Sequence, residues 1–411
     1  MPDNSFKVYP YRWVILGVFS LVNLTVQMLW ICFAPITGPA ARFYGVSELQ
    51  IGFLAMVFMI VYVPLSIPTA WMIDSMGYRK AVSIGAVLLG VFGMTRGIFS
   101  AQYSWVLIST IGLAVAQPFM MNAISTVAAK WFPISERATA SGLVLVASFI
   151  GIAIGQVLSP MLMLAYSIPA MLMIFGIATA VSSVLFLIFT REAPPTPPCP
   201  EGQETRALML DGLRTMLKMK DIWFLIILFL VGMGIFNGVS TWIEGIVRPR
   251  GFSVTQAGDL GGLLLVGAIV GAAIFPLLSD KLRKRKIFLQ MGMLLAIPGL
   301  IGFTFATQYW VLMISMFSLG FFLMSMAPIG YQYAAEITYP APEGTSNGLL
   351  NMAGQASVVF IYIMQVMKSP NGSFTYSLVF LVLPMLLCTL MILAMTESTF
   401  LSTEASAESS L

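Results

Sequence analysis

Uncharged polar and aromatic side chains inside long apolar stretches are the residues of this sequence whose types could bind a ligand. Carboxamides carry both donors and acceptors, and aromatic faces attract cations. The 411 residues include no histidine, and the three cysteines, Cys32, Cys199 and Cys388, are far apart. A histidine-ligated metal, a Ser-His-Asp triad and a histidine proton relay are therefore excluded within this chain. We expect neither an enzyme nor a bound cofactor.

The composition places these side chains in a membrane. Hydrophobic residues make up 58% of the chain and charged residues 9%, whereas about a quarter of the residues in soluble domains are charged. The mean hydropathy is +0.91. Twelve apolar stretches between residues 13 and 395 reach the roughly 20 residues that a membrane helix needs. We predict an all-α polytopic protein that contacts the lipid bilayer, and the net charge of +4 is too small to indicate nucleic-acid binding.

A proline-rich, acidic stretch after Arg191 divides the twelve stretches into six and six. The predicted parts are an N-terminal six-helix bundle (1–190), a cytoplasmic linker (191–221), a C-terminal six-helix bundle (222–395) and a cytoplasmic tail (396–411). Within the linker, residues 207–220 have apolar residues at helical spacing. That pattern predicts a helix lying on the inner leaflet, or a solvated linker helix.

The basic residues indicate the orientation, because Lys and Arg accumulate on the cytoplasmic side of membrane proteins. With both termini inside, only five of the 21 basic residues fall on the outer side or at outer helix ends: Arg42, Arg96, Arg248, Arg250 and Lys368. We therefore predict a multi-pass protein of the cell membrane, inner or plasma, with cytoplasmic termini.

An internal repeat relates the two halves. An offset of 206 residues brings Ser47, Gln50 and Asp74 onto Ser253, Gln256 and Asp280. The Ser-x-x-Gln spacing in both copies predicts a capping box at a helix start. Two parallel six-helix halves are typical of the major facilitator architecture, in which the substrate binds between the halves near mid-membrane.

Residues near the helix midpoints should line such a site, and the candidates are Gln27, Trp30, Tyr62, Gln117, Phe236, Asn237, Asn351 and Gln355. No Asp, Glu, Lys or Arg falls near these midpoints. Arg96 and Glu244 fall toward the outer ends of their predicted helices. An anion would require a basic partner, and proton coupling usually requires a buried carboxylate. Aromatic faces and neutral amides instead suit a quaternary ammonium ion.

A loop after the second predicted helix resembles the gating loop of major facilitator proteins. It contains Asp74, Gly77, Arg79 and Lys80 in the order expected for an Asp, a glycine turn and a basic pair. The second copy, from Asp280, lacks the glycine. We expect Asp74, Arg79 and Asp280 to latch the cytoplasmic side. The alternative is that the basic residues only anchor the topology.

Five strings carry a narrower resemblance: FYGV at 43–46, AQPF at 116–119, AAKWF at 128–132, FNGVST at 236–241 and AAEITYPAPEGTSNGLLN at 334–351. They resemble the feline leukaemia virus subgroup C receptor family of solute carriers, whose members are implicated in choline, ethanolamine and haem transport. The resemblance implies that Trp30 and Gln117 hold a choline head group, with Phe236 and Gln355 beside it. Asn237 stands where relatives have tyrosine.

These observations favour a monomeric secondary transporter for a choline-like organic cation, working by alternating access as a potential-driven uniporter. A proton-coupled exporter of drugs or metabolites is an alternative, which would have to use Asp74 or Glu244. Haem transport is less favoured because the chain has no histidine to bind iron and no basic residues near the helix midpoints. A receptor or scaffold that transports nothing is a further alternative.

Overall fold

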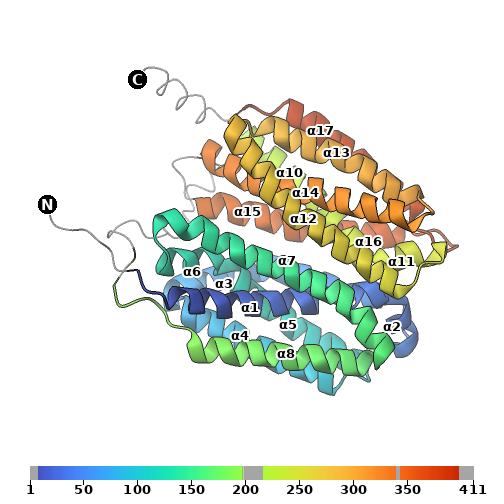
Figure 1. Ribbon diagram of the computed structural model, residues 1–411, viewed down its shortest axis with the longest axis horizontal. Helices are drawn as coiled ribbons and strands as arrows, with labels where there is room; N and C mark the ends of the chain where they lie inside the picture. Colours follow the sequence, from blue (N-terminus) through green and yellow to red (C-terminus); the bar gives the residue numbers. More distant parts are fainter. Residues whose placement is uncertain (1–7, 197, 199–215, 339–342, 398–411) are drawn as a thin grey trace. The chain divides into compact units, whose positions relative to one another are not determined.

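The computed structural model describes residues 8–196, 198, 216–338 and 343–397, and its elements are helices (Figure 1). The chain divides into two compact units, Met1–Ala207 and Leu208–Leu411. Twelve segments of the described chain are long and apolar enough to span a membrane. The prediction of an all-α polytopic protein is therefore confirmed. Most of the predicted linker helix at 207–220 and most of the tail at 396–411 lie outside the described residues.

Unit 1 contains the first six spans. Its elements are α1 (Arg12–Ile31), η1 (Ala34–Ile36), α2 (Thr37–Tyr44), α3 (Glu48–Met76), α4 (Tyr78–Ile98), α5 (Tyr103–Asn122), α6 (Ile124–Trp131), α7 (Ile134–Ala165) and α8 (Ile168–Phe189). Helix α1 packs against α7 and α8, and α4 packs against α8 and α5.

Unit 2 contains the other six spans. Its elements are α10 (Lys220–Thr241), α11 (Ile243–Val247), η2 (Arg248–Arg250), α12 (Val254–Leu282), α13 (Lys286–Phe305), α14 (Tyr309–Thr338), α15 (Glu343–Ala356), α16 (Val358–Val366) and α17 (Thr375–Leu393). Helix α14 packs against α12 and α13, and α10 packs against α15 and α16.

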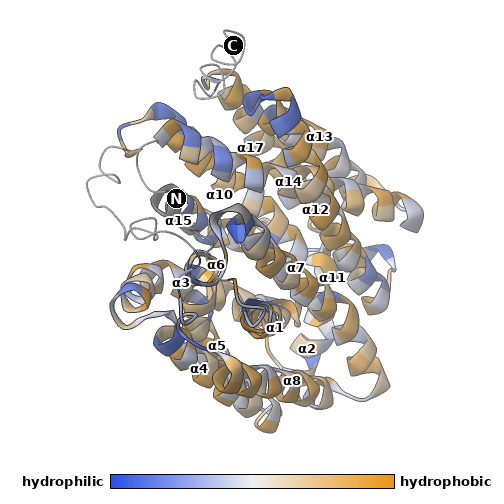
Figure 2. Ribbon diagram, turned by 60° about the vertical axis from the view of Figure 1, so that its left-hand side comes forward, coloured by the Kyte–Doolittle hydropathy of each residue, from blue (hydrophilic) through white to orange (hydrophobic). Residues whose placement is uncertain are grey.

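Apolar side chains cover the outside of the helices as well as their packed faces. Figure 2 shows hydrophobic residues along the helices and hydrophilic residues mainly near their ends and in the connections. Trp71 is 67% exposed, Leu277 69% and Ile188 66%. Such exposure of large apolar side chains suits contact with lipid.

Glycines allow several helices to approach closely. A Cβ atom on Gly271 of α12 would lie 2.0 Å from the carbonyl oxygen of Phe321 in α14, and one on Gly320 would lie 2.0 Å from that of Leu264. In unit 1, a Cβ on Gly151 of α7 would lie 2.1 Å from the Leu24 carbonyl oxygen of α1. Small residues at such contacts are typical of membrane helix packing.

Both predicted capping boxes are present. The Ser47 side chain accepts a hydrogen bond from the Gln50 backbone N–H, and the Gln50 side chain accepts one from the Ser47 N–H. Ser253 and Gln256 repeat the arrangement at the start of α12. These side chains satisfy N–H groups that helix starts leave free.

Four spans that the sequence suggested as single helices are interrupted, including the first and the eleventh. Helix α1 ends at Ile31, and Pro35 follows at the start of η1. A proline at 35 would clash with the carbonyl of residue 31 in a continuous helix, so the proline accounts for the break. The eleventh span breaks between α15 and α16 at Ser357, whose hydroxyl donates to the Gly354 carbonyl at 2.6 Å.

Candidate functional site

Three of the predicted binding residues are buried in unit 1, and two of them are hydrogen-bonded to each other. The side-chain NH₂ of Gln117 on α5 donates to Oε1 of Gln27 on α1 at 3.3 Å. Trp30 lies on the same helix as Gln27, and its indole N–H donates to the Ala55 carbonyl of α3 at 3.1 Å. All three predicted side chains are buried, with 8% of Gln27, 7% of Trp30 and 3% of Gln117 exposed. We call Gln27, Trp30 and Gln117 the amide–indole cluster.

The amide–indole cluster contains one unused acceptor. Oε1 of Gln117 is buried and has no hydrogen-bond partner. A buried carbonyl oxygen without a partner is uncommon in folded proteins, because it loses its hydration without compensation. This oxygen could therefore accept a hydrogen bond from a bound ligand, while the indole offers a π face to a cation.

Tyr62 is used within the scaffold. Its hydroxyl donates to Oδ1 of Asn122 at 2.8 Å, and the Asn122 NH₂ donates to the Ser66 carbonyl and the Thr69 hydroxyl, each at 2.9 Å. This network joins the end of α5 to the part of α3 that contains two prolines. Asn122 was not predicted, and only its polarity inside an apolar stretch could have indicated it.

The predicted residues of unit 2 lie around the break between α15 and α16. Asn237 of α10 donates to the Ser357 hydroxyl at 3.2 Å, and it is 8% exposed. Asn351 of α15 accepts a hydrogen bond from the Tyr331 hydroxyl at 2.5 Å. Gln355 is half-buried on α15. Tyr331, which the sequence analysis missed, thus connects α14 to α15.

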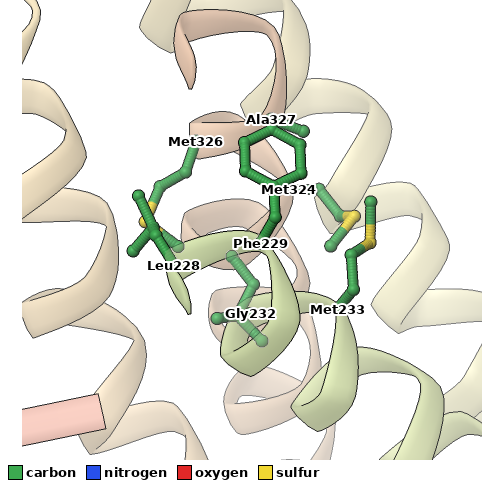
Figure 3. Close-up of a pocket in the computed structure, with 8 residues that line it drawn as sticks. Leu228, Phe229, Gly232, Met233, Met324, Met326 and Ala327 are labelled. Carbon is green, nitrogen blue, oxygen red and sulfur yellow. The ribbon is translucent and has the colours of Figure 1, made fainter. Parts of the chain in front are cut away.

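Phe236 is buried on α10, at 3% exposure, and a small apolar pocket lies one to two turns before it on the same helix. Figure 3 shows this pocket, which is lined by Leu228, Phe229, Gly232, Met233, Leu323, Met324, Met326 and Ala327. Met233 and Leu323 stand 206 residues after Gln27 and Gln117. Two of the residues that line the pocket are therefore the apolar counterparts, within unit 2, of Gln27 and Gln117.

Buried charges occur in both units away from the helix midpoints. Arg96, in the last turn of α4, is 1% exposed. Its guanidinium donates to the Leu29 carbonyl at 3.0 Å and lies 4.9 Å from the Phe33 ring centroid. Arg96 is thus closer to Trp30 than its place in the sequence suggested. Glu244 is 2% exposed in α11 and pairs with Arg248 at 3.4 Å.

No set of three potential metal ligands (His, Cys, Asp or Glu) gathers anywhere in the described chain.

Two of the predicted gating residues lie on either side of Gly77, which joins α3 to α4. Asp74 is exposed near the end of α3, and the backbone N–H of Arg79 donates to the Glu192 carboxylate at 2.8 Å. Glu192 also pairs with Lys130. Gly77 has φ of +86°, and a Cβ there would lie 2.6 Å from a Glu192 oxygen. The glycine therefore permits both the turn and the approach of Glu192.

In unit 2, Asp280 pairs with Arg285. Arg285 is 5% exposed and also binds the buried carboxylate of Glu336, at 2.9 Å. Burial alone would lower the pKa of Arg285, but the hydrogen bonds and charges of Glu336 and Asp280 raise it above its ordinary value. Through these contacts, Arg285, which directly precedes α13, connects the end of α12 to the end of α14.

In each repeat, a glutamate carboxylate accepts a hydrogen bond from the backbone N–H of the equivalent arginine. The Arg285 N–H donates to Glu397 at 2.8 Å, as the Arg79 N–H does to Glu192. Arg79 and Arg285 are 206 residues apart. The sequence analysis missed both glutamates, because they follow the last helix of each unit and no local pattern indicates their partner.

The fold and these loops define a class of membrane transporter. The family model of the Major Facilitator Superfamily matches residues 19–360 and, in a second match, 245–409. The chain belongs to this superfamily. It is a multi-pass membrane protein and a transporter of small molecules, and the family's members are not enzymes.

Particular relatives confirm the narrower resemblance. Solute carrier family 49 member A3 of Danio rerio is 31% identical over 385 residues, covering 90% of this chain and 81% of that protein. Choline/ethanolamine transporter FLVCR2 of Rattus norvegicus is 30% identical, covering 88% and 70%. Choline/ethanolamine transporter FLVCR1 of Mus musculus is 32% identical, covering 87% and 70%.

A solved structure shares the fold. The crystal structure of a bacterial homologue of the human lysosomal transporter Spinster, inward-facing and unoccupied, superimposes with a TM-score of 0.69. It covers 96% of this chain and 97% of its own, at 16% sequence identity. At that identity the similarity shows the common fold alone.

Proposed function

We propose that this protein carries a small organic cation of the choline type across the membrane by alternating access, as a uniporter driven by the membrane potential. The Trp30 ring attracts the ammonium group. Oε1 of Gln117 accepts a hydrogen bond from the polar end of the substrate. Phe236, Asn237, Asn351, Gln355 and Tyr62 remain predicted contacts.

The observation that carries this proposal is the amide–indole cluster, in which Trp30 and two hydrogen-bonded neutral amides are each buried and one amide oxygen has no partner. A cation–π contact stabilises a bound cation by about 0.5–2 kcal/mol without a formal counter-charge. The names of two relatives, choline/ethanolamine transporters, support the same substrate class.

The proposed driving force follows from the charge of the substrate. A monovalent cation moving inward gains about 2.3 kcal/mol per 100 mV, which corresponds to roughly fiftyfold accumulation. No coupling ion is then required. Since the amide–indole cluster has no titratable side chain, it offers no proton site of its own.

The remaining parts of the proposal concern placement and gating. We place the protein in the cell membrane as a monomer, with both termini in the cytoplasm and bundles at 1–190 and 222–395 joined by a cytoplasmic linker. Asp74, Arg79 and Asp280 belong to the cytoplasmic gate. The ion pair between Asp280 and Arg285 supports a latch built from helix ends.

Thermal unfolding of the purified protein with candidate ligands tests the substrate class. A ligand that binds the folded state raises the unfolding temperature in proportion to RT ln(1 + [L]/Kd). We expect choline and ethanolamine to raise it, and haem, amino acids and sugars to leave it unchanged. Stabilisation by haem alone would replace the proposed substrate with haem.

Two variants locate the site. Trp30→Leu should weaken choline binding by about 2- to 30-fold, because it removes the cation–π contact, and Trp30→Phe should lose less. Trp71→Leu is the matched control, since Trp71 is 67% exposed on the outside of α3. Equal binding by Trp30→Leu and the control would place the cation elsewhere.

A further inference from the structure

One face of α1 carries a polar residue that the proposed site does not use. Asn23, Gln27 and Trp30 are spaced i, i+4 and i+7 on an unbroken helix, so the three side chains lie along one face. Asn23 is 1% exposed. Its position on this face, one turn before Gln27, makes it a neighbour of the amide–indole cluster.

The orientation of the Asn23 amide is determined by its contact. Its NH₂ group donates to the Phe19 carbonyl at 2.9 Å. A backbone carbonyl only accepts hydrogen bonds, so the NH₂ must face Phe19 and the carbonyl oxygen must face the other way. That oxygen, Oδ1, is buried and has no hydrogen-bond partner.

Two buried amide oxygens of unit 1, Oδ1 of Asn23 and Oε1 of Gln117, thus have no partner. Both are acceptors, so the ligand group that would satisfy either of them is a hydrogen-bond donor, and a hydroxyl with its one proton donates to one of the two at a time. The residue at the equivalent place in the repeat of unit 2 is Phe229, which lines the apolar pocket. The unpaired acceptor is thus a feature of unit 1 and not a requirement of the repeated fold.

We propose that Asn23 is a substrate-binding residue whose Oδ1 accepts a hydrogen bond from the hydroxyl or N–H end of an amino alcohol, while the cationic end lies against Trp30. This inference rests on the proposed function. The ligand class is a cation with a hydrogen-bond donor a short distance from its charge. A cation without a donor would leave the Asn23 oxygen unsatisfied.

The distances along α1 suit a ligand of this size. Seven residues of helix separate Asn23 from Trp30, a rise of about 10 Å. A cation lies within about 6 Å of the ring centroid that attracts it, and a hydrogen bond to oxygen adds about 2.8 Å. These two lengths account for most of the rise, so only a short link between the ammonium group and the hydroxyl is needed.

Binding of three cations to the wild type and to Asn23→Leu tests the inference. The probes are choline, ethanolamine and tetramethylammonium, which has no hydrogen-bond donor. The leucine has a similar size but no acceptor. Asn23→Leu should weaken choline and ethanolamine by about tenfold and change tetramethylammonium by less than about twofold.

A second pair of variants separates a binding role from a structural one. Asn23→Gln keeps a neutral amide that both donates and accepts hydrogen bonds, and it should retain part of the preference for choline over tetramethylammonium. Asn23→Ala removes the oxygen and serves as the test should Asn23→Leu fail to fold. Size-exclusion chromatography and the unfolding temperature without ligand report folding.

The other outcomes are distinguishable. An equal loss of all three probes in Asn23→Leu or Asn23→Ala would assign Asn23 to packing and overturn this inference alone. Unchanged choline binding would do the same. A wild type that binds none of the three cations would overturn the proposed function, and this inference with it.

Discussion

At the scale of single residues, the amide–indole cluster combines neutral groups where many transporters use charges. Gln27 and Gln117 satisfy each other in part, and an unpaired buried amide oxygen costs about 1–3 kcal/mol until a ligand donates to it. A carboxylate in the same place would attract a cation more strongly but would also take up protons. Neutral amides therefore suit a carrier that binds a permanent cation independently of pH.

Arg285 allows a stability prediction at the same scale. Arg285→Met leaves the Glu336 carboxylate, whose side chain is 5% exposed, without its ion-pair partner and with only the Gln332 amide donating to it. Removing one member of a buried ion pair costs about 3–5 kcal/mol. We expect a clear fall in the unfolding temperature of the detergent-purified protein. The pair with Asp280 contributes less, because the Asp280 side chain is 59% exposed.

The double variant Arg285→Met with Glu336→Leu is the control. It removes both charges, and replacing a whole buried pair by apolar residues is often neutral. The double variant should therefore recover much of the lost stability. The pKa of Arg285 is raised in the folded protein above its ordinary value. The stability that its charge contributes would therefore be lost only as the pH rises through this raised pKa. The effect of Arg285→Met should accordingly be the same at pH 6 and pH 8.

The sequence alone made Gln27, Trp30 and Gln117 candidates for binding, because polar and aromatic side chains stand out in apolar stretches, and their binding role stays a prediction. It did not predict their partners. Asn23 and Asn122 carry the same signal, but which polar residue pairs and which stays unpaired depends on packing between helices. Glu192 and Glu336 were missed for the same reason, since each meets a helix that is distant in the sequence.

At the scale of elements, hydropathy predicted the twelve spans and the Ser-x-x-Gln spacing predicted two helix starts. The interruption of the first span after Ile31 was not predicted, although Pro35 supplies a local reason for it. The break at Ser357 has no comparable signal. Interruptions of this kind are tolerated in membranes where other groups satisfy the freed backbone, as Arg96 does at the Leu29 carbonyl.

Two glycines of unit 2 give a matched prediction for helix packing. Gly271→Ala should destabilise the protein by about 1–3 kcal/mol, because its Cβ would lie 2.0 Å from the Phe321 backbone oxygen and force α12 away from α14. Gly232→Ala should be neutral or stabilising, since its Cβ would meet only a Met326 carbon at 3.9 Å and alanine favours the helix. Unfolding temperatures of the two variants provide the measurement, and equal values would contradict the packing assigned to α12 and α14.

At the scale of the whole molecule, the repeat preserves helix caps and loop contacts while the binding chemistry has diverged. Ser47 and Ser253 cap equivalent helices, and Arg79 and Arg285 make equivalent backbone contacts. By contrast, the polar face of α1 in unit 1 corresponds to Phe229, Met233 and Phe236 in unit 2. On these equivalent helix faces, polar side chains therefore occur in unit 1 and apolar ones in unit 2.

The sequence could predict the superfamily and the candidate residues, because the repeat and the motifs are recognised from residue types and their spacing alone. The substrate and its driving force depend on a free-energy difference across the membrane, and this difference is measured directly only by transport.

Uptake of radiolabelled choline into proteoliposomes, with a potassium diffusion potential and no pH gradient, is the decisive measurement. An inside-negative potential of 100 mV should drive roughly fiftyfold accumulation, and collapsing the potential should abolish it. Trp30→Leu should reduce the rate and Trp71→Leu should not. Uptake that follows an imposed pH gradient and ignores the voltage would contradict a potential-driven uniporter with an uncharged site.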